Sequence, residues 1–147
     1  MLKRFMKPRW MVAAALFGVV AALAIPTAFA VSPHFIYANV TSVTSTSITV
    51  SFKEAGLGNS LNSVNISFTG TALCINGGGH HPKAVNKTGF AVSGTFNVSN
   101  GQATGTLTGT ATFQPPCNPP MTVEWTDLVV TDTTFNDSVS IPGTFSP

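Results

Sequence analysis

Hydrophobic and polar residues alternate along seven runs of the chain. The runs cover residues 34–41, 46–54, 63–75, 89–99, 102–113, 121–131 and 138–145. In residues 46–54, for example, Ile48, Val50 and Phe52 alternate with serine, threonine and lysine. Such alternation is typical of strands that bury one face, because successive side chains of a strand point to opposite faces. With no helical pattern after residue 30, the sequence predicts an all-β domain, a single immunoglobulin-like or fibronectin III-like antiparallel sandwich of about seven strands.

Local signals refine this prediction at two places. Asn100-Gly101 separates two alternating runs and predicts a type I′ hairpin turn, in which both central residues have positive φ. In residues 121–131 the alternation passes through Trp125 and then shifts phase to Leu128, which predicts a β-bulge near Thr126-Asp127. Trp125 shares its face with apolar neighbours, and we therefore expect it in the core.

The only two cysteines of the chain are Cys74 and Cys117. If the strands alternate in direction, the loops at 75–88 and 114–121 leave the sandwich at the same end, which brings the two cysteines together. An exported domain with one such pair is expected to oxidise it. Closing a loop of this length stabilises a fold by about 4 kcal/mol in the chain-entropy model.

Residues 1–30 have the pattern of a signal peptide. A basic start is followed by an apolar run over residues 11–25 and by Ala28-Phe29-Ala30, with small residues where signal peptidase cleaves. The apolar run is shorter than the roughly 20 residues of a membrane-spanning helix. We therefore expect residues 31–147 to be secreted as an extracellular β-sandwich with no stable membrane insertion after cleavage. An uncleaved N-terminal anchor is the alternative.

The charge of the predicted mature domain narrows the list of partners. Four of the seven basic residues lie within the first nine positions, and from residue 31 onward three lysines face five acids. Binding to nucleic acid or to an anionic membrane requires clustered lysine and arginine on the working domain. The sequence therefore argues against both partners.

Candidate catalytic and metal-binding residues are few. The loop Gly77-Gly78-Gly79-His80-His81 offers two imidazoles, which bind zinc or copper, but no third ligand is evident. Asp127, Asp132 and Asp137 cluster in sequence and are a candidate calcium site. No nucleophile motif or paired-carboxylate pattern is present. We expect a protein that is not an enzyme and uses no cofactor, with a metal-binding or hydrolytic protein using His80 and His81 as the rival hypothesis.

A row of threonines marks the outer face of residues 102–113. Its members are Thr104, Thr106, Thr108, Thr110 and Thr112. Threonine is a favourable strand residue, and repeated threonines also form some ice-binding or glycan-binding surfaces. Gly105 and Gly109 on the opposite face predict a close backbone approach to this strand.

Two sequence resemblances support export and a β fold. The string VTSVTSTSITVSF at residues 40–52 resembles the first two strands of a fibronectin type III domain. The segments SPHF (32–35), SFKEAGLG (51–58), CINGGG (74–79), NGQATG (100–105), VTDTT (130–134) and IPGTF (141–145) resemble small secreted proteins of actinomycete-type bacteria. The second resemblance implies a secreted bacterial domain and brings no activity or functional residues.

Together these features predict a secreted, non-catalytic module with a recognition or structural role. Its partner is expected to be an extracellular protein or a glycan, with ligand and oligomeric state left open. Binding is expected in the loops at the cysteine-bearing end, because loops on rigid scaffolds commonly carry function. The candidate binding residues are Asn76, Gly77, Gly78, Gly79, His80, His81 and Asn118.

Overall fold

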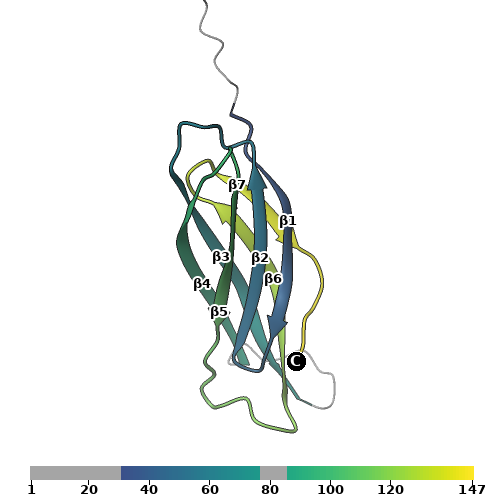
Figure 1. Ribbon diagram of the computed structural model, residues 1–147. Coiled ribbons are helices and arrows are strands. Elements are labelled where there is room, and N and C mark those ends of the chain that lie inside the picture. The colour runs from purple at the N-terminus through teal and green to yellow at the C-terminus, as the bar shows by residue number, and fades with distance from the viewer. Residues whose placement is uncertain (1–30, 77–85) are drawn as a thin grey trace, which may run out of the picture.

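The computed structural model describes residues 31–76 and 86–147 of the chain. The predicted signal peptide and most of the predicted binding loop lie outside these ranges. The described residues form a sandwich of seven strands (Figure 1). The strands are β1 (His34–Val43), β2 (Ser47–Ala55), β3 (Ser63–Ile75), β4 (Lys87–Asn97), β5 (Ala103–Thr110), β6 (Thr122–Asp132) and β7 (Asp137–Ile141).

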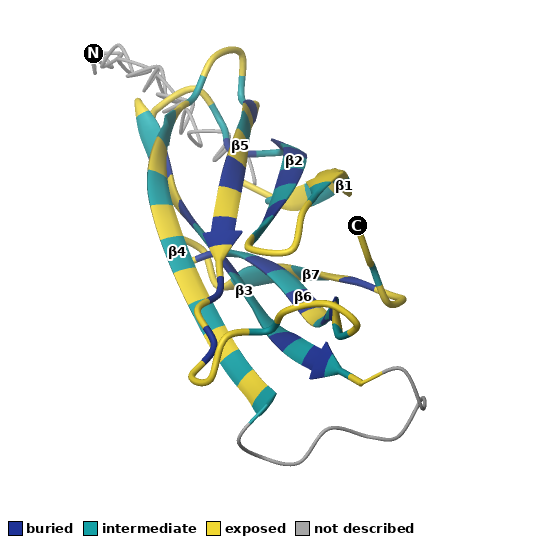
Figure 2. Ribbon diagram, turned by 90° about the horizontal axis from the view of Figure 1, so that it is seen from below, coloured by how far each residue is buried: buried dark blue, intermediate teal, exposed yellow. Residues whose placement is uncertain are grey.

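The strands form two antiparallel sheets, with the orders β1-β2-β5 and β4-β3-β6-β7. This confirms the predicted all-β, seven-stranded, immunoglobulin-like or fibronectin III-like sandwich. Figure 2 shows buried and exposed residues alternating along β5, as the sequence pattern requires. In the part of the chain that the structure describes, no helix is long and apolar enough to cross a membrane.

Two strands end earlier than the alternation predicts. β5 ends at Thr110, although Ala111 and Phe113 continue into the core. β7 ends at Ile141 because Pro142 has no backbone N–H to donate to the ladder. The chain then returns to β6, where Phe145 exchanges two backbone hydrogen bonds with Trp125. The alternation therefore reports burial correctly in both segments and overestimates strand length.

The core lies between the sheets and includes Trp125, which is fully buried. Its indole Nε1–H donates a hydrogen bond to the Thr44 carbonyl oxygen at 3.1 Å. This bond connects β6 of one sheet to the β1–β2 turn of the other. The predicted core position of Trp125 is confirmed, and the polar edge of its ring has the partner that a buried indole requires.

The predicted turn and bulge are both present. Asn100 and Gly101 have φ angles of 51° and 69°, the left-handed conformations of a type I′ hairpin. In β6 the register with β3 shifts between the pairs Thr69–Val129 and Thr71–Thr126. Asp127 lies at this shift with a φ of 54°. The bulge allows both Trp125 and Leu128 to face the core.

Aromatic rings from β4 cover the two inner-face glycines of β5. A Cβ built on Gly105 would lie 2.1 Å from a ring carbon of Phe96, and one on Gly109 would lie 2.1 Å from a ring carbon of Phe90. The expected close approach of backbone is corrected, because the atoms nearest to both glycines belong to aromatic side chains of β4. The contact closes the sandwich along its β4–β5 side.

A disulfide joins Cys74 to Cys117, with 5.8 Å between their Cα atoms. Cys74 is near the end of β3, and Cys117 lies in the segment between β5 and β6. The predicted pairing is confirmed, and so is the argument that both loops leave the sandwich at the same end.

Substituting the covered glycines tests this packing. Gly105→Ala and Gly109→Ala are each expected to lower the free energy of unfolding by about 1–3 kcal/mol, because the new methyl group overlaps a ring held in the core. Gly89→Ala on the exposed face of β4 is the matched control, since its nearest atom would lie 3.8 Å away. Urea unfolding measures all three variants. Equal stability of Gly89→Ala and Gly105→Ala would contradict the packing described.

Removing the disulfide tests its contribution. Cys74→Ser/Cys117→Ser is expected to unfold with a free energy about 4 kcal/mol lower than the oxidised protein, because the unfolded chain regains loop entropy. The same measurement on reduced wild-type protein should agree with the double variant. A difference below about 1 kcal/mol would show that the cross-link restricts the unfolded chain less than the chain-entropy model assumes.

Candidate functional site

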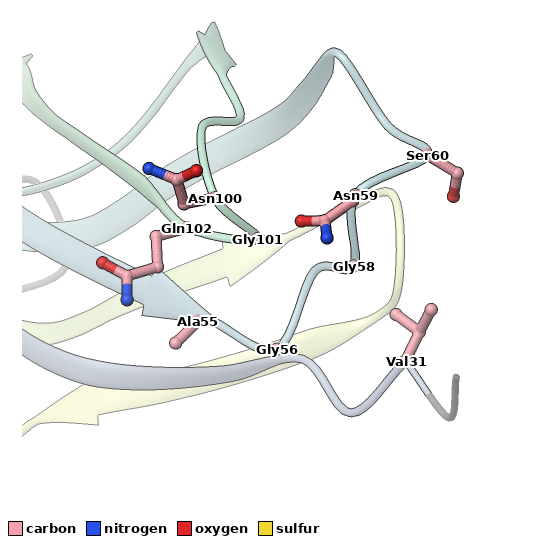
Figure 3. Close-up of a pocket in the computed structure, with 9 residues that line it drawn as sticks. All are labelled: Val31, Ala55, Gly56, Gly58, Asn59, Ser60, Asn100, Gly101 and Gln102. Atoms are coloured by element: carbon pink, nitrogen blue, oxygen red, sulfur yellow. The ribbon is translucent and has the colours of Figure 1, made fainter.

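An open groove lies at the end of the sandwich opposite the disulfide. Its volume is about 740 Å³. Three segments enclose it: the start of the described chain, the loop after β2 and the hairpin between β4 and β5 (Figures 1 and 3). The lining residues are Val31, Ala55, Gly56, Gly58, Asn59, Ser60, Asn100, Gly101 and Gln102.

Glycine conformation shapes the loop that follows β2. Gly56 and Gly58 have φ angles of 77° and 72°, which L-residues with side chains rarely adopt. A Cβ on Gly56 would lie 1.9 Å from the Ser32 carbonyl oxygen, so the incoming chain passes directly over this glycine. The sequence Ala-Gly-Leu-Gly therefore folds the loop back against the start of β1.

Backbone hydrogen bonds attach the three segments to one another. The Ser32 N–H donates to the Gly56 carbonyl at 3.0 Å, and the Leu57 N–H donates to the Gly101 carbonyl at 3.0 Å. The Leu57 side chain is fully buried and anchors the loop in the core. The groove is thus formed by loops that are tied together.

The groove presents neutral polar groups. Asn59, Asn100 and Gln102 contribute side-chain amides, each of which both donates and accepts hydrogen bonds. Figure 3 shows the Asn59 side chain extending toward the Asn100–Gly101 turn. Val31 adds an exposed apolar surface at one side. No ionisable side chain lines the groove among the residues that the structure describes.

The sequence prediction pointed to the other end of the molecule. Asn76 and Asn118 are both exposed and lie close in sequence to Cys74 and Cys117, respectively. Residues 77–81, which include His80 and His81, lie outside the described ranges. The groove was missed, although the glycines of the loop after β2 and the Asn-Gly turn gave a local signal. Strand parity would have placed these two turns at the same end.

The candidate calcium ligands do not converge. Asp127 is exposed in the bulge of β6, whereas Asp132 is fully buried at the end of that strand. Within residues 31–76 and 86–147, no three His, Cys, Asp or Glu residues are grouped closely enough to hold a metal ion.

The threonine row continues onto the neighbouring strand. The predicted row on β5 is exposed, and Ser47, Thr49 and Ser51 of β2 pair with Thr110, Thr108 and Thr106. The Thr49 and Thr108 hydroxyls are 2.8 Å apart and share a hydrogen bond. This face of the sheet is therefore rich in hydroxyl groups, and it also carries Lys53, which pairs with Thr104.

Two acidic residues that the sequence prediction did not single out as a pair are buried beneath the groove end. Glu54 and Asp132 both have 0% of their surface exposed. Burial raises the pKa of Glu54 to about 8, with further contributions from the charge of Asp132, a side-chain interaction with it, and the charge of Asp137. Neither acid lines the groove, but Glu54 directly precedes Ala55 and Gly56, which do.

Comparison with known proteins adds no assignment. No family model matches the chain, and no curated protein matches it.

Proposed function

We propose that the protein is exported by its N-terminal segment and acts outside the cell as a non-catalytic recognition module. The observation that carries this proposal is the amide-lined groove, which offers hydrogen-bonding groups without a titratable side chain. Catalysis by acid–base or nucleophilic chemistry would need such a side chain at the bound ligand. The groove instead provides the features of a binding site.

The proposed ligand is neutral and rich in hydrogen-bonding groups. A glycan or an extended segment of an extracellular protein has this chemistry, because hydroxyls and peptide groups complement side-chain amides. Apart from the α-amino group that cleavage after Ala30 would create on Val31, the described lining of the groove offers a charged ligand no ionic partner to replace its lost hydration. Binding should therefore depend little on salt concentration, in contrast to recognition by clustered charges.

The scaffold supports recognition by limiting the entropy lost on binding. The loop after β2 and the Asn100–Gly101 turn are fixed by backbone hydrogen bonds, and the opposite end is cross-linked. A preformed site loses less conformational freedom when a ligand binds. The disulfide is also compatible with the proposed location outside the cell.

The disulfide-bearing end is the second candidate binding surface. The Cys74–Cys117 bond holds the chain near Asn76 and Asn118 together at that end. This arrangement is compatible with binding at the disulfide-bearing end, which the sequence prediction favoured. Substitutions at each end, described next, separate the groove from this second surface.

Paired amide substitutions test where the ligand binds. Asn59→Ala/Gln102→Ala is expected to weaken binding to an array of neutral oligosaccharides and uncharged peptides at least about tenfold, because buried ligand groups lose their partners. Asn76→Ala/Asn118→Ala is the matched control and should bind as wild type does. Loss of binding only in the control pair would move the site to the disulfide end. Absence of any binding by folded wild-type protein would overturn the proposal.

Metal analysis tests the rival function. We expect the purified mature domain to contain no stoichiometric zinc, copper or calcium after dialysis, as measured by mass spectrometry of the elements. One equivalent of zinc or copper that is lost in His80→Ala/His81→Ala would instead establish the metal-binding hypothesis.

A further inference from the structure

Glu54 and Asp132 belong to different sheets and interact inside the sandwich. Glu54 is the second-last residue of β2, where it pairs with Phe35 of β1 and Ala103 of β5. Asp132 is the last residue of β6 and pairs with Ile66 of β3. Both side chains are completely removed from solvent. Both acids are therefore buried between the sheets and, after burial itself, the charge of Asp132 is the largest influence that raises the pKa of Glu54.

Most of the oxygens in this pair have no hydrogen-bond partner. Asp132 Oδ1 accepts a hydrogen bond from the Thr134 N–H at 2.6 Å. Both side-chain oxygens of Glu54 and the Oδ2 atom of Asp132 have no partner among the described residues. Buried carboxyl oxygens without partners are costly when ionised. A proton on Glu54 removes one charge and supplies a donor for Asp132.

Within residues 31–76 and 86–147, the charged groups that shift the pKa of Glu54 include no positive one. The charged groups that act on Glu54 are Asp132 of β6 and Asp137 of β7, and both are acidic. Lys53 lies on the opposite face of β2, where it pairs with Thr104. His34 of β1 is exposed, and its Nδ1 lies 2.9 Å from the Ser32 carbonyl oxygen. Proton uptake is therefore the available way to neutralise the pair within the described structure.

We propose that a proton held by Glu54, buried with the partnerless Oδ2 oxygen of Asp132, makes the groove end of the sandwich responsive to pH. With the proton in place, the two carboxyl groups are compatible with the packed interior. Without it, two negative charges face each other between the sheets. The strand end carrying Glu54 continues into Ala55 and Gly56, so loosening at the pair reaches the groove directly.

The expected pH dependence is opposite to that of an ordinary salt-bridged acid. The pKa of Glu54 is 4.5 in the reference state and about 8 in the folded protein. Below the lower value both folded and unfolded states hold the proton, and stability is greatest. Between the two values only the folded state holds it, so stability falls as pH rises. Above about pH 8 both states have released the proton, and this loss is complete.

Urea unfolding from about pH 4 to about pH 9.5 tests the proposal. The urea concentration at the midpoint of wild-type unfolding is expected to decrease as pH rises from about 5 to about 8. In Glu54→Gln this decrease should be absent. Glu124→Gln, on the half-buried outer face of β6, is the matched control and should follow wild type. If the glutamine changes stability by the same amount at every pH, the test still holds, because it depends on the slope of stability against pH. Parallel pH profiles of wild type and Glu54→Gln would overturn the proposal.

A second variant tests the partnership with Asp132. Asp132→Asn keeps an acceptor for the Thr134 N–H and removes the neighbouring charge. The upper end of the pH-dependent fall should then move to lower pH, because ionised Glu54 no longer meets a second carboxylate. An unchanged profile in a folded Asp132→Asn variant would show that the two acids are not coupled.

Amide hydrogen exchange tests whether the response is local to the groove end. The Leu57 N–H, bonded to Gly101, reports on that end, and the Ala111 N–H, bonded to Thr46, reports on the other. After correction for intrinsic exchange rates, protection at Leu57 should fall more than protection at Ala111 when pH is raised above about 8. Equal loss at both amides would contradict a local response. Glu54→Gln should abolish the difference between them.

Discussion

Aromatic rings that cross between the sheets hold this sandwich together. Phe96 of β4 meets Phe52 of the other sheet edge-on, with their ring centroids 4.8 Å apart. Phe90 packs edge-on against Phe68 at 5.1 Å and Trp125 at 5.6 Å, both in its own sheet, and its ring covers Gly109 of the other sheet. These rings can approach β5 only because Gly105 and Gly109 carry no side chain. The position of β5 then fixes the hairpin that forms one wall of the groove.

Patterns that depend on neighbouring residues predicted the fold well. Alternation located all seven strands, and the Asn-Gly turn and the phase shift in β6 identified local geometry correctly. Strand parity was enough to bring Cys74 and Cys117 together. These predictions succeeded because strand periodicity and turn conformation are set within a few residues, and an antiparallel order then limits where each loop can lie.

The groove and the acid pair depend on relations that the sequence pattern does not contain. Glu54 continues the inward positions of Ile48, Val50 and Phe52, but a polar residue at a strand end is ordinarily solvated at the rim. Its burial depends on which residues of the opposite sheet lie across from it. The groove likewise depends on how the chain before β1 crosses Gly56, a contact between segments that have no local sequence signal in common.

The two ends of the sandwich are stabilised by different chemistry. The Cys74–Cys117 disulfide secures the end where β3 and β5 exit, and redox conditions decide whether this bond is formed. Backbone hydrogen bonds and a buried acid pair secure the groove end, where the state of one proton changes the electrostatic energy. Because the core between them is continuous, each end adds to the same global stability. Local opening at the groove end can nevertheless respond to pH while the disulfide keeps the opposite end closed.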